Sequence, residues 1–218
     1  PEGPVVNAVE NADGIQANVS GAFAAGDSVS LLLTRPDGTT TTVVRAVTAA
    51  EVASGVASVT LPSQAVQGGY TLRASIVDAA GNTGAASSPS TFTLSSSGPG
   101  APVLALPEAT DGFVNAAEAT SGGGTPVTVT LPTGTASGAT LALVLTVPGS
   151  APATINYTVT AADVAAGSAT VLIPTANLAA NGAYSVVGTL TDGAGNAGTP
   201  SAARAFTVDR TVVAPGVP

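Results

Sequence analysis

The sequence predicts an all-β protein built from two tandem β-sandwiches of about seven strands each. The main observation is an internal repeat: VNAVENADG at Val6 returns as VNAAEATSGG at Val114, and YTLRASIVDAAGNTG at Tyr70 returns as YSVVGTLTDGAGNAG at Tyr184. Short runs of strand-forming residues between turn residues are the second observation. The third is an apolar content of 44% with only 3% aromatic residues, which favours cores of packed aliphatic side chains.

The repeat divides the 218 residues into a first module of residues 1–98 and a second module of residues 99–218. Residues 95–112 are rich in Ser, Gly and Pro, and we expect them to form the linker. VVAPGVP at Val212 has a similar composition and predicts a further module. The first residues, PEGPVV, lack the basic start and apolar core of a signal peptide, so we expect an internal piece of a longer array.

The expected strands of both modules are short and are bounded by Gly, Pro, Asn, Asp or Ser. Pro36 and Gly38 fit a hairpin turn, because proline presets φ and glycine tolerates positive φ. In the first module the strands are a segment near Val5 and residues 15–19, 28–35, 39–47, 56–61, 70–77 and 91–94. In the second they are residues 125–131, 140–147, 154–159, 169–173, 184–191 and 205–208, with 103–106 as a candidate first strand.

Two further repeated features have structural interpretations. TAAEVASG at Thr48 and TAADVAAG at Thr160 predict single helical turns, in which Glu51 and Asp163 serve the fold, Glu51 by closing a capping box. Tyr70 and Tyr184 each open a long strand after a glycine-containing turn. They fit either the tyrosine corner of immunoglobulin-like sandwiches or ordinary strand aromatics.

Composition excludes several classes of function. There is no His and no Cys, which removes the usual general base and the imidazole and thiolate ligands of transition metals. Five basic residues stand against 13 acidic ones, so the net charge of −8 argues against nucleic acid as a partner. No apolar run is long enough to cross a bilayer. We expect a monomer that is not an enzyme and has no membrane-inserted segment.

Acidic and amide side chains recur at matching places in the two modules. In an immunoglobulin-like sandwich we expect the first strand and the last strand connection to meet at one pole. Crowded carboxylates repel one another unless a cation neutralises them, and Ca²⁺ is the ion that accepts many oxygen ligands in flexible geometry. The expected metal group of the first module is Asn7, Glu10, Asp13, Asp78 and Asn82, and that of the second is Glu108, Asp111, Asn115, Glu118, Asp192 and Asn196.

A structural alternative exists for each of these motifs. DAAGNTG and DGAGNAG also fit tight turns in which Asp and Asn bond their own backbone, and this alternative is as well supported as the metal site. VNAxE also fits a strand start with solvated polar residues. Asp27 has no counterpart in the second module and is assigned to the solvated surface.

VNAxE, the late tyrosine, DGAGNAG and FTVDRTVVAP together resemble the bacterial Ig-like repeats of giant surface adhesins, including biofilm-associated and RTX-type adhesins. The resemblance covers nearly the whole chain and implies an immunoglobulin-like fold with calcium at the module junctions. It implies that Asp192, Asn115 and Glu118 serve the central junction and Asp209 the next one. Ser95 stands where the family pattern has an aspartate, so Glu108 or Asp111 would compensate, or this junction would be weaker and more flexible than its neighbours.

The resulting hypothesis is an extracellular extender on a bacterial cell surface, a rod that calcium stiffens and whose partners are the neighbouring modules of the same chain. The alternative is a module that binds a sugar or protein ligand, although only three Tyr and four Phe are available for an aromatic platform. A glycosidase, which needs two carboxylates flanking a substrate groove, is the third reading.

Overall fold

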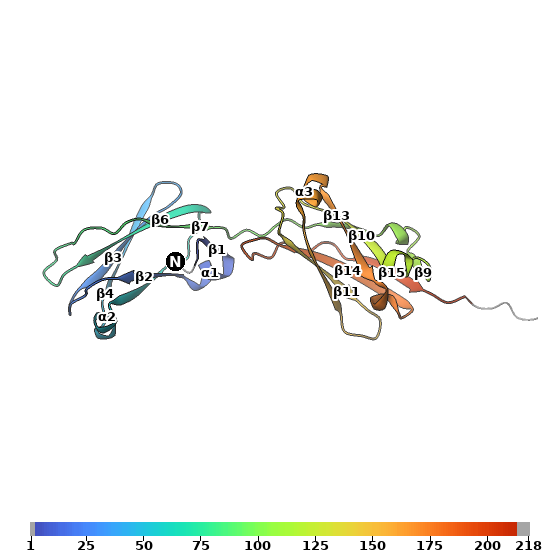
Figure 1. The fold of residues 1–218 in the computed structure, drawn as a ribbon, viewed down its shortest axis with the longest axis horizontal. Helices are drawn as coiled ribbons and strands as arrows, with labels where there is room; N and C mark the ends of the chain where they lie inside the picture. The colour runs from blue at the N-terminus through green and yellow to red at the C-terminus, as the bar shows by residue number, and fades with distance from the viewer. Residues whose placement is uncertain (1–2, 213–218) are drawn as a thin grey trace, which may run out of the picture. The chain divides into compact units, whose positions relative to one another are not determined.

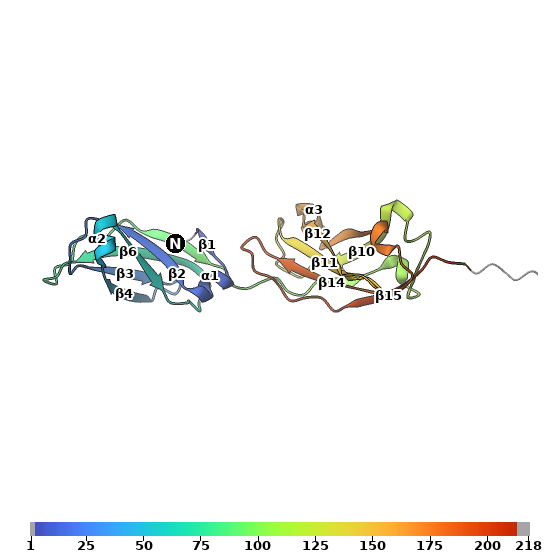
Figure 2. The same cartoon turned by 90° about the horizontal axis from the view of Figure 1, so that it is seen from below.

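The computed structural model describes residues 3–212 and contains two compact units, Pro1–Ser97 and Gly98–Pro218, which we call unit 1 and unit 2. Each unit is a β-sandwich, as Figures 1 and 2 show. The predicted all-β, immunoglobulin-like class is therefore confirmed. Each sandwich has its own apolar core, built from residues of both of its sheets.

Unit 1 packs a five-stranded sheet of order β1-β7-β6-β3-β4 against the two-stranded sheet β2-β5. Along β3, Val29, Leu31 and Leu33 point into the core and alternate with more exposed residues, as expected for a strand with one buried face. Its strands are β1 Val5–Val6, β2 Ile15–Ser20, β3 Ser28–Thr34, β4 Thr40–Ala46, β5 Val56–Leu61, β6 Gly68–Val77 and β7 Ser90–Leu94, and its helices are α1 Ala8–Asp13 and α2 Ala49–Ser54.

Unit 2 packs a five-stranded sheet of order β12-β11-β14-β15-β9 against the three-stranded sheet β13-β10-β8. Its strands are β8 Val103–Ala105, β9 Phe113–Asn115, β10 Gly124–Thr130, β11 Thr140–Thr146, β12 Ala153–Thr158, β13 Ser168–Pro174, β14 Gly182–Thr191 and β15 Arg204–Asp209. The helical segments are α3 Ala161–Ala166 and the 3-10 turns η1 Pro107–Ala109, η2 Ser121–Gly123 and η3 Thr175–Leu178.

The predicted linker is mostly part of unit 2. Residues 103–105 form β8, which pairs antiparallel with β10, and Leu104, Leu106 and Ala109 are buried in the core of unit 2. Proline and serine made the segment resemble a flexible linker, but its alternating apolar residues give it a buried face. The additional strand β9 and helix α1 were not predicted.

Both tyrosines form tyrosine corners. Tyr70 Oη donates to the carbonyl oxygen of Val66 at 2.5 Å, and Tyr184 Oη donates to that of Ala180 at 2.9 Å. Each ring stacks on the aromatic residue of the neighbouring strand, with centroids 5.0 Å apart for Tyr70 and Phe92 and 5.4 Å apart for Tyr184 and Phe206. The hydrogen bonds decide between the two interpretations offered by the sequence.

The two predicted capping turns are confirmed. Thr48 and Glu51 close a capping box on α2, and Thr160 and Asp163 close one on α3. Glu51 also forms a salt bridge, with Arg45 Nη2 and Glu51 Oε1 2.5 Å apart. The hydrogen bond from Arg45, together with one from the Thr48 backbone, lowers the pKa of Glu51 from 4.5 to about 2.

This shift predicts an acid sensitivity of unit 1. Because the folded-state pKa of Glu51 is depressed, its stabilising contribution is complete above pH 4.5 and is lost as the pH falls toward 2. We expect Glu51→Gln to be less stable than the wild type at pH 7, and to lose less stability between those pH values. Urea unfolding of both proteins at about pH 7, 4.5 and 2 measures the difference. Parallel pH profiles would show that the Arg45 contact does not stabilise the fold.

No helix among residues 3–212 has the length and apolar character needed to cross a membrane.

Candidate functional site

The DxxGN motifs form the same hydrogen-bonded turn in both units. In unit 1, Asp78 Oδ1 accepts from the backbone N–H groups of Ala80 and Asn82 at 2.9 and 2.8 Å, and Asp78 Oδ2 accepts from Asn82 Nδ2 at 2.8 Å. Gly81 has φ 91°, a conformation that glycine adopts without strain. The motif therefore forms the hydrogen-bonded tight turn that the sequence offered as the alternative to a metal site. Any metal would bind to a carboxylate that already orders this turn.

The turn of unit 2 repeats this geometry in a more buried setting. Asp192 Oδ1 accepts from Ala194 N at 2.9 Å and from Asn196 N at 2.8 Å, and Oδ2 accepts from Asn196 Nδ2 at 3.0 Å. Asn196 is 5% exposed, whereas Asn82 is exposed. Burial raises the pKa of Asp192, but the hydrogen bonds from Asn196 outweigh it and the net pKa is lowered. Hydrogen bonding by Asn82 also lowers the pKa of Asp78. Both side chains are therefore carboxylates at neutral pH.

In each VNAxE motif the asparagine and the glutamate cap the turn that begins directly after the asparagine. Asn7 Oδ1 accepts from the backbone N–H groups of Val9 and Glu10, and Glu10 Oε2 accepts from Asn7 N at 2.8 Å. Asn115 and Glu118 make the equivalent bonds, with Glu118 Oε2 2.8 Å from Asn115 N. The N-x-x-E spacing signals this reciprocal cap, and the sequence interpretation as a solvated strand edge missed it.

The expected grouping of acidic residues in unit 1 is wrong. Strand β1 pairs in parallel with β7, placing Val6 beside Leu94, and Leu94 pairs with Gly68 at the start of β6. Asn7, Glu10 and Asp13 therefore lie near the start of β6, whereas Asp78 and Asn82 follow its end (Figure 1). Strand β6 has 10 residues, so at about 3.3 Å per residue the two groups are roughly 30 Å apart.

The same topology divides the predicted group of unit 2. Strand β9 pairs in parallel with β15, so Asn115 lies beside Asp209 and near the start of β14. Asp192 and Asn196 follow the far end of β14. Asp111 belongs to the pole of Asn115, where its Oδ1 accepts from Phe113 N at 2.9 Å, and Glu108 lies upstream in η1. Asp111, Asn115, Glu118 and Asp209 thus share one pole, and Asp192 and Asn196 occupy the other.

Asp27 is not on the solvated surface. It is 7% exposed, and its Oδ2 accepts from Ala24 N at 2.8 Å, which closes the turn before β3. The sequence suggested exposure because the position has no acidic counterpart in the second module. Its role is to satisfy a backbone donor inside a turn.

The poles carry oxygen donors of the kind that calcium prefers, namely carboxylates and amide carbonyls. Across residues 3–212, however, no three acidic side chains converge in an arrangement that could hold a metal. Calcium takes six to eight oxygen ligands. The oxygen donors at each pole are therefore of the type that calcium binds. Their number at any one pole is too small for calcium coordination unless further ligands are added.

Comparison with known proteins identifies the family of the first unit. Residues 6–93, nearly all of unit 1, match the model of the bacterial Ig-like domain. Unit 1 belongs to that family, as the sequence resemblance implied, and unit 2 repeats its motifs. No curated protein matches the chain.

Several solved structures of adhesion proteins are similar to the chain. A 1.5-MDa bacterial ice-binding adhesin is 28% identical, with 95% of this chain and 61% of that chain covered and a TM-score of 0.46. A Ca²⁺-stabilized adhesin of an ice-binding Antarctic bacterium is 27% identical (96% and 47% covered, TM-score 0.49). A tetra-tandem repeat from the extending region of a large adhesion protein is 20% identical (94% and 47% covered, TM-score 0.42). The chain spans about half to three fifths of these solved chains.

Proposed function

We propose that this chain is an extender segment of a bacterial cell-surface adhesin, a tandem array of Ig-like sandwiches whose work is mechanical and extracellular. The repetition of one sandwich within one polypeptide carries the proposal, because serial modules lengthen a chain without needing a catalytic cleft. The connection between the units is short. Strand β7 ends at Leu94, and the carbonyl of Pro99 already accepts a hydrogen bond from Thr199 N within unit 2.

Calcium at the junction is the finer part of the proposal. In unit 1, Ser95 N donates to the carbonyl of Val6, so the chain leaves unit 1 next to Asn7 and Glu10. In unit 2, a Cβ placed on Gly98 would come within 2.2 Å of the Ala197 carbonyl oxygen, so the chain enters next to the Asp192 turn. The poles that adjoin the connecting residues therefore each carry carboxylate and amide oxygens.

This assignment revises the ligand set that the sequence suggested. We propose Glu10 and Asn7 as donors of unit 1, and Asp192 and Asn196 as donors of unit 2. Asn115 and Glu118 lie at the opposite pole of unit 2, with Asp209, and would serve the next junction downstream. Among residues 3–212, no three acidic side chains converge at the pole of Asn7 and Glu10 or at the pole of Asp192. Calcium would therefore draw the ligands of two successive modules together and restrict their motion.

The two DxxGN turns provide a matched test. For a Kd of about 0.1 to 1 mM, about 10 mM calcium should stabilise the wild type by roughly 1.4 to 2.7 kcal/mol. We expect Asp192→Asn to remove most of this stabilisation. Asp78→Asn breaks the same turn at the pole away from the connection, and should leave the calcium response unchanged.

Differential scanning calorimetry in calcium and in chelator reports the response of each variant. The runs in chelator give the stability that each variant loses by breaking the turn itself. The calcium response is the difference in stability between calcium and chelator for the same protein. Equal calcium responses in the wild type and both variants would reject Asp192 as a ligand.

A further inference from the structure

The two units differ in one strand. In unit 2 the smaller sheet has the order β13-β10-β8, whereas in unit 1 the smaller sheet is β2-β5 alone. Gly55 and Gly167 end equivalent helices, so Leu61 of β5 corresponds to Ile173 of β13. Leu61 pairs with Ile15, and Ile173 pairs with Thr125. Residues 18–20 of β2 therefore correspond to residues 128–130 of β10, which are the residues that pair with β8.

Strand β8 covers the core of unit 2 with one leucine. Leu104 lies opposite Val129 in the ladder and is 9% exposed. Its Cδ2 lies 3.2 Å from the position that a Cβ on Gly188 would occupy, the same distance as Leu143 Cδ2. Leu104 thus fills the space between β10 and the larger sheet.

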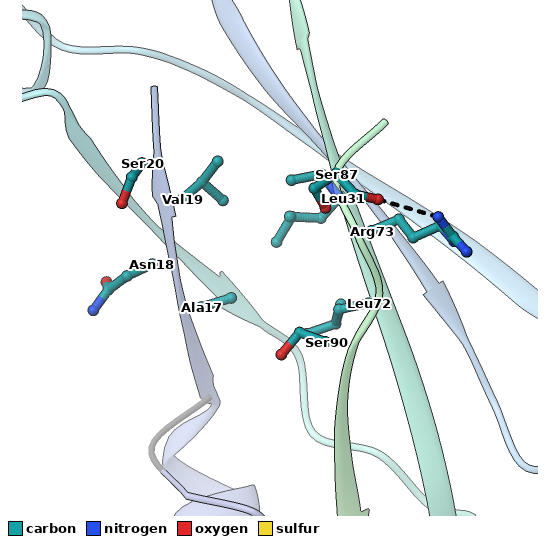
Figure 3. A pocket seen from close by; sticks show the side chains of 10 residues that line it. Ala17, Asn18, Val19, Ser20, Leu31, Leu72, Arg73, Ser87 and Ser90 are labelled. Atoms are coloured by element: carbon teal, nitrogen blue, oxygen red, sulfur yellow. Dashed lines mark hydrogen bonds between the residues drawn. The ribbon is translucent and has the colours of Figure 1, made fainter. Parts of the chain in front are cut away.

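Unit 1 has a cavity of about 180 Å³ at the equivalent place. One wall is residues 17–20 of β2, and the opposite wall includes Leu31 and Ser87 (Figure 3). Ala74 also lines the cavity. By the repeat, Leu31 corresponds to Leu143 and Ala74 to Gly188. The cavity therefore occupies the space that Leu104 fills in unit 2.

The surface at and beside this cavity is less buried than the corresponding surface of unit 2. Val19 lines the cavity, and Ile76 lines an adjoining hollow that also includes Val19. Both side chains are half-buried, whereas the equivalent Val129 and Leu190 are both 0% exposed. Ser87 is exposed, although Ser201, which makes the same hydrogen bond to the neighbouring strand, is 8% exposed. A missing cover accounts for all three differences, since apolar surface is left open where a strand lies in the other unit.

We propose that the free edge of β2 in unit 1 binds an extended apolar β-strand, antiparallel and in the register that β8 takes on β10, with an aliphatic side chain opposite Val19 inserted into the cavity. The occupant is a strand of the β8 type, since residues 99–106 supply the strand that takes this position in unit 2. Pro1 and Glu2 repeat Pro107 and Glu108 in sequence, so a strand joined to Pro1 would take the place that β8 takes before Pro107. Backbone pairing along the edge would supply affinity, and the cavity would select the side chain.

A graft within the full chain tests this directly. Residues 99–106, PGAPVLAL, are placed immediately before Pro1, which reproduces the sequence context of β8. Hydrogen exchange should then slow about 10-fold or more at those backbone amides of residues 18–20 that face away from β5, since pairing protects them from solvent. The melting temperature of unit 1 should rise by about 5 °C.

The matched control carries Leu104→Asp in the grafted copy only, and we expect it to restore wild-type exchange because a carboxylate cannot enter the apolar cavity. As a second measurement, the free peptide PGAPVLAL should shift the methyl resonances of Val19 and Ala74 at saturation. Unchanged exchange in the graft together with no peptide shift would overturn the proposal. Dimerisation of the wild-type chain through β2 would also overturn it. In that case the protection of residues 18–20 would rise with the fraction of dimer, and the graft would not change it.

Discussion

Gly198→Ala is expected to destabilise unit 2 by about 3 kcal/mol, because overpacking against backbone leaves no flexible side chain to move aside. A Cβ at this position would lie 2.3 Å from the carbonyl oxygen of Pro99 and 3.0 Å from that of Leu190. The Pro99 carbonyl also accepts the hydrogen bond from Thr199 N at 3.1 Å, so the substitution pushes apart two segments that are bonded to each other.

Gly84→Ala is the matched control for Gly198→Ala. Gly84 occupies the equivalent place in unit 1, where the nearest atom to a new Cβ is the Ile76 carbonyl oxygen at 3.5 Å, an ordinary contact. We expect it to change stability by less than about 1 kcal/mol. Urea unfolding followed separately for each unit measures both effects. Equal losses in the two variants would show that the entry of the chain at Pro99 does not constrain unit 2.

Tyr184→Ala is expected to cost unit 2 about 3 to 5 kcal/mol, the range for removing a large buried aromatic ring. Tyr184 is 2% exposed and stacks on Phe206, so truncation leaves a cavity between β14 and β15. Tyr184→Phe keeps the ring but leaves the Ala180 carbonyl without its phenolic donor. That variant should cost about 1 kcal/mol.

The difference between these two variants separates packing from the corner hydrogen bond. Tyr70→Phe provides an internal replicate, because Tyr70 makes the same bond to Val66 and the same stack on Phe92. Denaturant unfolding of all three variants gives the comparison. A cost of Tyr184→Phe as large as that of Tyr184→Ala would contradict a corner stabilised mainly by ring packing.

Much of the fold could be predicted from the sequence because its signals are local. Alternating apolar residues located the strands to within about two residues of their ends, and S/T-x-x-D/E spacing located both helical turns. The tyrosine corner required only a glycine-containing turn before a long strand.

The placement of acidic residues could not be predicted in the same way. Which pole receives Asn7 or Asp78 depends on the parallel pairing of β1 with β7, a contact between segments far apart in the sequence. The motifs themselves do not encode that direction. Asp27 shows a related limit, because its burial follows from a turn hydrogen bond to Ala24 that composition does not reveal.

Small-angle X-ray scattering of the wild-type chain in about 10 mM calcium and in chelator tests the central claim most directly. The extender proposal predicts a longer maximum dimension and a narrower distribution of shapes in calcium, because ligands from successive modules would be held by one ion. Superimposable scattering curves in the two conditions would contradict a calcium-stiffened junction, and would leave the acidic turns as hydrogen-bonded structural elements of each sandwich.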